Sequence, residues 1–417
     1  MFILTTFFRT LRQKYSHLMA PYSTRVLNCD SSAITFHSTS DHPDITCQET
    51  LNALKTASHH LVDHLECVAF PTETVYGLGA VASSNAAAAH IFSTKGRPPD
   101  NPLIIHISSF TMLNSILPEN YTWPRAYEIL VKHFWPGALT LLFPRNPEVI
   151  PAIITADQPT VAIRMPSHPV ARALIAIANV PLAAPSANTS GKPSPTRAEH
   201  VVRDLDGKIN VILDGGACGV GLESTVVDGL HEDGNIRVLR PGGVTVEDME
   251  KILQEEMADF DHIPRVLVHR RDYLDELVEQ TPTTPGMKYR HYSPSVPVTL
   301  LLTKTSPPAD NLAISATSFF ASLINAKTLK IGVLAPADSL LWGFMPLVDG
   351  LEWCRYQLGP STQPSAAAHR LFDGLLTLEA RGVDLMLIEE VGEEREGLAV
   401  MNRVRKAAGD IRWISFE

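Results

Sequence analysis

The sequence predicts an α/β protein of two domains joined by a proline-rich linker. Its 417 residues exceed the usual length of a single core, which predicts two domains of unequal size. Short apolar runs alternate with helical patterns from residue 67 to residue 243, and this alternation is typical of α/β folds. A second alternation follows residues 279–297, whose prolines exclude a helix or a central strand.

The elements of the first domain follow in chain order. A helix is predicted over 48–64, because Leu51, Leu54 and Leu61 share one face. Strands are expected at 68–70, 103–107, 139–143, 161–164, 182–184, 211–213, 224–228 and 237–239. Further helices are expected at 85–93, 124–134, 168–179, 197–205 and 246–257.

The second domain is predicted to be a smaller α/β unit. Its expected strands are 298–302, 330–334 and 384–390, and its expected helices are 366–381 and 398–408. It carries no group of residues that indicates chemistry. The whole chain is therefore divided into a disordered leader with a targeting role as one reading (1–45), a catalytic domain (46–260), a linker (261–297) and the second domain (298–417).

Composition excludes several classes of protein. A hydrophobic share of 45% and a charged share of 19% are those of a globular protein. No apolar run reaches the roughly 18 to 20 residues that a membrane-spanning helix needs. The net charge of −10 argues against a protein that coats nucleic acid. The five cysteines, none spaced as CxxC, indicate a reducing compartment without a zinc or disulfide framework.

The N-terminal segment differs from the rest. No acidic residue occurs between Met1 and Cys29, while Arg9, Arg12 and Lys14 lie among hydroxyl and apolar residues. This composition resembles a mitochondrial targeting segment, with a plain disordered tail as the alternative. A cytoplasmic protein with a mitochondrial pool is the resulting expectation.

Basic residues occur in rigid loops of the first domain. Phosphate-loop and GxGxxG signatures are absent from the sequence, so any nucleotide site must be built in another way. Prolines, glycines and hydroxyl residues surround these cations, a combination typical of a phosphate or carboxylate pocket. The cations are Lys95, Arg97, Arg164, Lys192, Arg197, Arg240, Lys288 and Arg290.

Two further segments are rich in polar groups. FPTETVYGLG (70–79) combines hydroxyls, a carboxylate and a phenol, and suits a small ligand that has an amine and a hydroxyl. PSANTSG (185–191) is a run of short donors and acceptors that could bind a ribose, a base edge or a phosphate.

These segments together resemble the threonylcarbamoyl-AMP synthase family, in its long two-domain form. The matching strings occur in the family's order across roughly residues 48 to 417. They are FPTETVYGLG, KGRPPDNPLIIHI, FWPGALTLLF, TVAIRMPSHP, APSANTSGKPSPT, ESTVVD, VLRPGG and the linker string PGMKYRHYSP. The resemblance implies a twisted mixed-sheet catalytic domain of the YrdC type and a smaller Rossmann-like C-terminal domain.

The resemblance also implies a reaction. L-threonine, bicarbonate and ATP would give threonylcarbamoyl-AMP and pyrophosphate, with Mg²⁺ carried in by ATP and without a protein metal site. A tRNA threonylcarbamoyltransferase complex would receive the product for threonylcarbamoyladenosine at position 37 of tRNA. Weak binding of tRNA or double-stranded RNA is a further expectation.

Site residues carry over position by position from the resemblance. L-threonine would contact Thr72, Tyr76, His106, Arg164, Ala184 and Ser224, with Arg164 on its carboxylate. ATP would contact Lys95, Arg97, Pro99, Thr160, Ser186, Asn188, Ser194, Arg240 and Tyr292. Lys95 and Arg97 are expected to be catalytic, because they supply positive charge for the departing pyrophosphate. Many relatives have serine where Pro99 stands, so only a backbone contact is expected there. His106 could be a base or a hydrogen-bonded binder.

Two alternatives from other classes stay open at this stage. One is a double-stranded RNA-binding or ribosome-associated module without turnover, against which the net negative charge counts. The other is a carbamoyltransferase that uses carbamoyl-adenylate. Hydrogenase maturation proteins of that kind carry zinc-finger and acylphosphatase-like segments that this sequence lacks.

Overall fold

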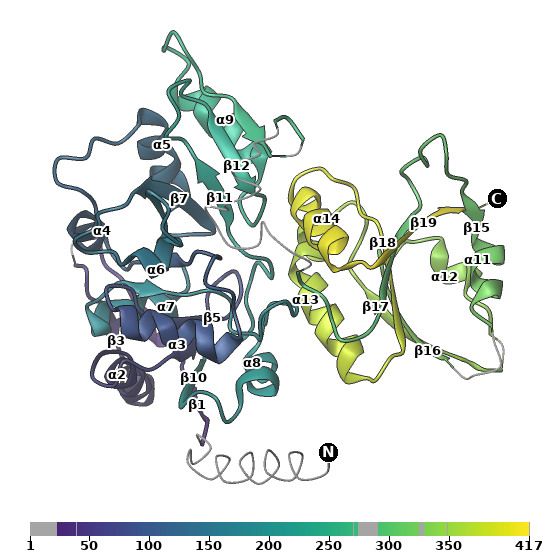
Figure 1. Ribbon diagram of the computed structural model, residues 1–417, viewed down its shortest axis with the longest axis horizontal. Helices are drawn as coiled ribbons and strands as arrows, with labels where there is room; N and C mark the ends of the chain where they lie inside the picture. The colour runs from purple at the N-terminus through teal and green to yellow at the C-terminus, as the bar shows by residue number, and fades with distance from the viewer. Residues whose placement is uncertain are drawn as a thin grey trace, which may run out of the picture.

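The structure is a computed structural model that describes residues 23–38, 40–269, 271–273, 291–324, 329–347 and 349–416. Two α/β domains lie side by side, with helices α13 and α14 of the second domain facing the first (Figure 1). Among the described residues, none of the helices has the length and apolar character needed to cross a bilayer.

The first domain is built on one mixed sheet of eleven strands, in the order β1-β10-β4-β5-β9-β6-β8-β7-β11-β12-β13. Parallel and antiparallel pairs both occur, which confirms the predicted mixed sheet. The strands are β1 (Arg25–Asn28), β4 (Val68–Phe70), β5 (Gly77–Val81), β6 (Ile104–His106), β7 (Leu139–Pro144), β8 (Thr160–Arg164), β9 (Leu182–Ala183), β10 (Val211–Asp214), β11 (Thr225–Asp228), β12 (Ile236–Arg240) and β13 (Val266–Val268).

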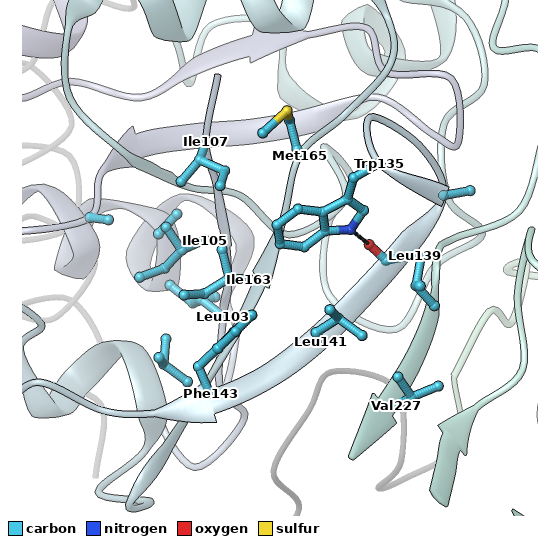
Figure 2. Packing of buried hydrophobic residues seen from close by; sticks show 14 of the residues in the cluster. Leu103, Ile105, Ile107, Trp135, Leu139, Leu141, Phe143, Ile163, Met165 and Val227 are labelled. Atoms are coloured by element: carbon cyan, nitrogen blue, oxygen red, sulfur yellow. Dashed lines mark hydrogen bonds between the residues drawn. The ribbon is translucent and has the colours of Figure 1, made fainter. Parts of the chain in front are cut away.

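Helices cover both faces of this sheet. They are α2 (Gln48–Val62), α3 (Asn85–Lys95), α4 (Phe110–Ile116), α5 (Arg125–Phe134), α6 (Ala152–Thr155), α7 (Pro169–Ala178), α8 (Ala198–Leu205) and α9 (Val246–Glu256), with a short turn η1 (Ser31–Ala33) and a small pair β2 (Ile34–Thr35) and β3 (Asp44–Ile45). Successive residues of a strand point to opposite faces, so Val211 and Leu213 pack beneath α2 and α7 while Ile212 joins the other core. Figure 2 shows part of that larger core, where the Trp135 indole donates to the Leu139 carbonyl at 2.7 Å.

The second domain contains a parallel sheet of six strands in the order β15-β19-β14-β18-β16-β17. Its strands are β14 (Val298–Leu302), β15 (Ile314–Ser315), β16 (Leu329–Ala335), β17 (Leu351–Gln357), β18 (Leu385–Glu389) and β19 (Asp410–Ser415). One face packs on α13 (Pro364–Ala380) and α14 (Glu396–Ala407), and the other on α11 (Ala316–Ser322) and α12 (Leu341–Phe344). Helices on both faces of a parallel sheet are the Rossmann-like arrangement that the sequence predicted.

The structure corrects the expected domain boundaries. Residues 25–45 do not belong to a disordered leader, because β1 pairs in parallel with β10 and Ile34 is buried in the first domain. At the other end β13 pairs with β12, so the sheet continues to Val268, past the expected boundary at 260. β1 and β13 are held by main-chain hydrogen bonds to β10 and β12, and the composition of a short segment does not predict such pairing. The targeting prediction falls mainly on residues 1–22, outside the described residues.

One strand of the first sheet was not predicted. β5 begins at Gly77, inside the polar segment 70–79, and pairs with β4. Two glycines weaken the sequence signal for a strand. Gly79 is required by packing, since a Cβ there would lie 2.6 Å from the Phe70 ring.

Candidate active site

A cavity with about 520 Å³ of empty space, partly open to solvent, lies where the first domain meets the linker. The ends of β6, β8 and β12 surround it, together with the loops after β4 and β9. The structure therefore brings together residues that lie far apart in the sequence. Those that were predicted as site residues and line the cavity are Thr72, Arg97, His106, Arg164, Ala184, Ser186, Ser224, Arg240 and Tyr292.

Two of these residues come together through strand register. His106 ends β6 and Arg164 ends β8, and the parallel pairing of the two strands places them directly opposite each other. Because neighbouring parallel strands lie about 4.8 Å apart, both side chains reach the same end of the cavity. The Arg164 guanidinium donates to Glu73 Oε1 at 2.6 Å, to Thr74 Oγ1 at 2.9 Å and to the Gly137 carbonyl at 3.1 Å.

The loop after β4 is shaped by its own hydroxyl groups. Thr72 Oγ1 donates to the Val75 carbonyl at 2.6 Å and lies 2.7 Å from Thr74 Oγ1. Glu73 Oε2 accepts from the backbone amide of Ser167 at 3.1 Å. This loop thus turns Thr72 and Thr74 toward Arg164 and fixes the guanidinium with a carboxylate. A small group that carries both a carboxylate and a hydroxyl would find complementary partners at this end.

A second set of cations, of which Arg97 and Arg240 line the cavity, comes from α3, the loop after it and the end of β12. Lys95 ends α3, is only 2% exposed, and donates to the carbonyls of Ser186 and Asn188. Gly96 follows it with a φ of +61°, which turns the chain sharply into the Arg97 loop. Arg97 donates to the Pro102 carbonyl at 2.9 Å, and Arg240 donates to the Ser224 carbonyl at 2.9 Å.

Burial makes these cations energetically costly. Withdrawal from water, and then the neighbouring charge of Arg97, lower the pKa of Lys95 well below its usual value. Burial and the charge of Arg240 lower the pKa of Arg97 to about 9. Like charges that depress one another's pKa form a site that gains free energy when a polyanion enters. This arrangement suits a di- or triphosphate.

The neutral state of His106 follows from its surroundings. Its Nδ1 lies 3.1 Å from the Ile104 carbonyl, and burial followed by the charge of Arg164 lowers its pKa to about 3. A ring that stays neutral near pH 7 can accept or donate one hydrogen bond. His106 would take up a proton from a substrate only with difficulty, so this environment favours a binder over a base.

Lowering the pH from 7 to 5 should cost about 2 kcal/mol of unfolding free energy at His106 alone. The imidazole of the unfolded chain takes up a proton near pH 6.5, but the folded one does so only near pH 3. The unfolded state therefore binds more protons in this window, and stability falls as the pH falls. Urea denaturation of the wild type and of His106→Gln at both pH values should show a smaller loss in the variant. The exposed His42→Gln variant is the control, and equal losses in all three proteins would contradict the expectation.

The linker residue Tyr292, which was predicted to contact ATP, lines the cavity. It is almost completely buried with a φ of +63°, and its ring lies 5.3 Å from the ring of Phe372 in the second domain. Burial and then the charge of Glu223 raise the pKa of its phenol to about 12. Lys288 and Arg290 lie outside the described residues.

Six predicted site residues, Lys95 among them, do not line the cavity directly. Tyr76 points elsewhere, since its hydroxyl donates to the Gly216 carbonyl at 2.8 Å. Pro99 is exposed, and Thr160 begins β8, roughly 13 Å along the strand from Arg164. Asn188 and Ser194 are buried and contact other residues of the site: the Asn188 backbone accepts from Lys95, and Ser194 Oγ donates to Glu223 at 2.5 Å. The direct contacts predicted for Tyr76, Pro99 and Thr160 therefore find no support in this geometry.

Two basic loops of the predicted pocket are also directed elsewhere. Lys192 pairs with Asp204 at 2.8 Å, and Arg197 pairs with Asp373 of the second domain at 2.8 Å. Asp204 lies on α8, 12 residues after Lys192, whereas Asp373 lies 176 residues after Arg197. A cation in a rigid loop is therefore not enough to predict membership of the cavity.

Sequence reasoning missed the acidic members of the site. Glu73 and Glu223 each hold a cation, although both lie inside the recognised strings FPTETVYGLG and ESTVVD. Their position beside predicted ligand residues was the signal that could have found them. Arg403, which pairs with Glu223 from the second domain, had no comparable signal. Within the described chain, no cluster of three or more His, Cys, Asp or Glu side chains could hold a metal ion.

Comparisons with known proteins match most of the chain. Residues 61–242 match the family model described as telomere recombination, which covers Sua5, YciO and YrdC proteins, and residues 244–409 match the model of the threonylcarbamoyl-AMP synthase C-terminal domain. The chain is 41% identical to threonylcarbamoyl-AMP synthase of Schizosaccharomyces pombe, over 92% of this chain and 97% of that protein. It is 43% identical to the enzyme of that name from Pyrococcus abyssi, over 82% and 90%. The crystal structure of Pyrococcus abyssi Sua5 complexed with L-threonine superimposes with a TM-score of 0.72, covering 94% of this chain and 100% of that one at 38% identity.

Proposed function

The chain belongs to the threonylcarbamoyl-AMP synthase family, and on this premise we propose how its cavity forms the product. L-threonine, bicarbonate and ATP meet there and leave as threonylcarbamoyl-AMP and pyrophosphate. One observation carries the proposal: Arg164 lies at one end of the cavity, while Arg97 and Arg240 line the same cavity from other loops. Two substrates that are both anions need such a divided set of cations.

L-threonine occupies the end formed by Thr72, His106 and Arg164. Its carboxylate faces the Arg164 guanidinium, and its hydroxyl lies among the threonine side chains of the loop after β4. The relative from Pyrococcus abyssi was crystallised with L-threonine, which supports this placement. The amine then points toward the nucleotide side, where the reacting groups meet.

ATP occupies the side formed by Lys95, Arg97 and Arg240, and it brings Mg²⁺ as part of the substrate. The threonine amine attacks bicarbonate, and loss of water leaves a carbamate on the nitrogen. A carbamate oxygen then attacks the α-phosphorus, an α-phosphate–oxygen bond forms, and the bond to the β-phosphate breaks so that pyrophosphate leaves. This displacement needs no protein nucleophile. The chain contributes by holding two anions together and by stabilising charge on the leaving group.

We infer from the family which enzyme uses the product. A tRNA threonylcarbamoyltransferase complex would accept the threonylcarbamoyl group for adenosine 37. The basic, acid-free N-terminal segment supports a mitochondrial pool beside a cytoplasmic one.

A direct assay tests the proposed reaction. The purified chain, incubated with ATP, bicarbonate and L-threonine, should form threonylcarbamoyl-AMP detectable by mass spectrometry, with one pyrophosphate released for each adenylate. Omission of bicarbonate should stop both signals, because the carbamate cannot form. L-serine in place of threonine should react at least about 10-fold more slowly, since it lacks the methyl group. Pyrophosphate release that is independent of threonine would contradict the proposal.

A further inference from the structure

One side chain of the second domain, Arg403, contacts a residue of the cavity wall. Arg403 on α14 is 0% exposed, and its guanidinium lies against Glu223, which lines the cavity. Its Nε and Nη2 donate to Glu223 Oε2 at 3.2 and 3.1 Å, and its Nη1 donates to the Pro241 carbonyl. A guanidinium completely removed from water is tolerated only when such partners satisfy it.

These contacts hold two backbone segments next to Arg240, one at Glu223 and Ser224 and the other at Pro241. Glu223 immediately precedes Ser224, whose carbonyl accepts from Arg240, and Pro241 immediately follows Arg240. The other oxygen of Glu223 accepts from Ser194 at 2.5 Å. The Arg403 guanidinium also lies 5.7 Å from the centre of the Tyr292 ring. One residue of the second domain thus contacts three segments that border the nucleotide side.

Arg403 neutralises the negative charge of Glu223. A carboxylate in the wall of a site for a polyanion repels that ligand, and the repulsion is strong where water is excluded. Arg403 pairs with this carboxylate from behind. The net charge of the pair is zero, and Arg97 and Arg240 remain available to a triphosphate.

We propose that Arg403 is a positioning residue for ATP, supplied by the second domain, which neutralises and orients Glu223 at the wall of the nucleotide site. This inference rests on the proposed function of the same cavity. It assigns a role to the second domain: without α14, the first domain would present to the triphosphate a carboxylate that has lost its salt-bridge partner.

Direct binding separates this role from a merely structural one. In Arg403→Met the side chain keeps its length but loses its charge, so the dissociation constant for ATP should rise about 100-fold. The dissociation constant for adenosine, which carries no phosphate, should change less than about 3-fold, because the repulsion acts on charge. Calorimetric titration of each ligand into the full chain measures both values. Equal losses for ATP and adenosine, or unchanged ATP binding, would overturn the inference.

A double variant tests the same idea without an unpaired buried charge. Arg403→Met with Glu223→Gln removes both charges, so it should fold and bind ATP at least about 10-fold more tightly than Arg403→Met alone. If Arg403→Met does not fold, the double variant is compared with the wild type instead, and ATP affinity lower by more than about 10-fold would overturn the inference.

Arg395→Met is the matched control. Arg395 precedes the same helix and also pairs across the domain boundary, with Asp248 at 3.2 Å, but the pair is exposed. Its loss should leave both dissociation constants within about 3-fold of the wild type. A loss of ATP binding there as large as in Arg403→Met would mean that domain docking alone matters, and would overturn the inference. Failure of the wild type to bind ATP would instead refute the proposed function.

Discussion

Lys95→Met is expected to lower the turnover number at least about 1,000-fold while the chain still folds. The methionine fills the space of the buried stem, so packing is retained, but the positive charge beside Arg97 is lost. The carbonyls of Ser186 and Asn188 also lose their donor, which loosens a loop of the nucleotide side. Pyrophosphate release at saturating substrates measures the turnover number, and circular dichroism checks the fold.

Lys251→Met is the control for this prediction. Lys251 lies on α9, and its pair with Glu255 at 3.9 Å is exposed, so its loss should leave turnover unchanged. A Lys95→Met enzyme that keeps more than a tenth of the wild-type turnover number would show that its charge is not needed for the leaving group.

Arg164→Met is expected to raise the KM for L-threonine about 1,000-fold, with a much smaller change in the KM for ATP. The guanidinium is the cation that faces the proposed carboxylate position, and its planar fork can donate to both carboxylate oxygens at once. Arg164→Lys keeps the charge but not the fork, so its KM for threonine should fall between those of the wild type and the methionine variant. Initial rates at varied threonine, with ATP held saturating, measure the effect.

Two further variants separate substrate binding from folding. Arg164→Met leaves Glu73 without its partner, and adding Glu73→Gln removes that unpaired charge, so the double variant should regain stability without regaining threonine affinity. Arg172→Met, on α7, removes a half-buried arginine that contacts the Ser108 carbonyl, and should leave both KM values unchanged. Recovery of normal threonine affinity in the double variant would show that Arg164 acts only on Glu73.

Local pattern was enough for most strands of the core, with the buried strand β5 as an exception. The strand β4 was predicted with its observed bounds, and the helix α2 ends two residues before its predicted end. Buried strands and amphipathic helices have a periodicity that depends only on which face meets the core. Edge elements lack this signal. In the edge strand β17, none of the seven residues of LEWCRYQ is fully buried, and the strand was missed.

The candidate site was predicted in part. Thr72, His106, Arg164 and Arg240 lie in recognised strings, and all four line the cavity. Lys192 and Arg197 have the same kind of loop, yet they pair with Asp204 and Asp373. Short strings record residue types and spacing, but they do not record which carboxylate another element brings within reach of a cation.

The sequence by itself determined the α/β class, the two-domain organisation, the family and most of the cations of the cavity, because periodicity and motif strings are local properties. Only the tertiary structure decided that β1 joins the first sheet, that Tyr76 and Thr160 lie away from the cavity, and that Arg403 reaches Glu223 across 180 residues of chain. The physical reason is that hydrogen bonds and ion pairs form between whatever groups the folded backbone places within about 3 Å, irrespective of sequence separation.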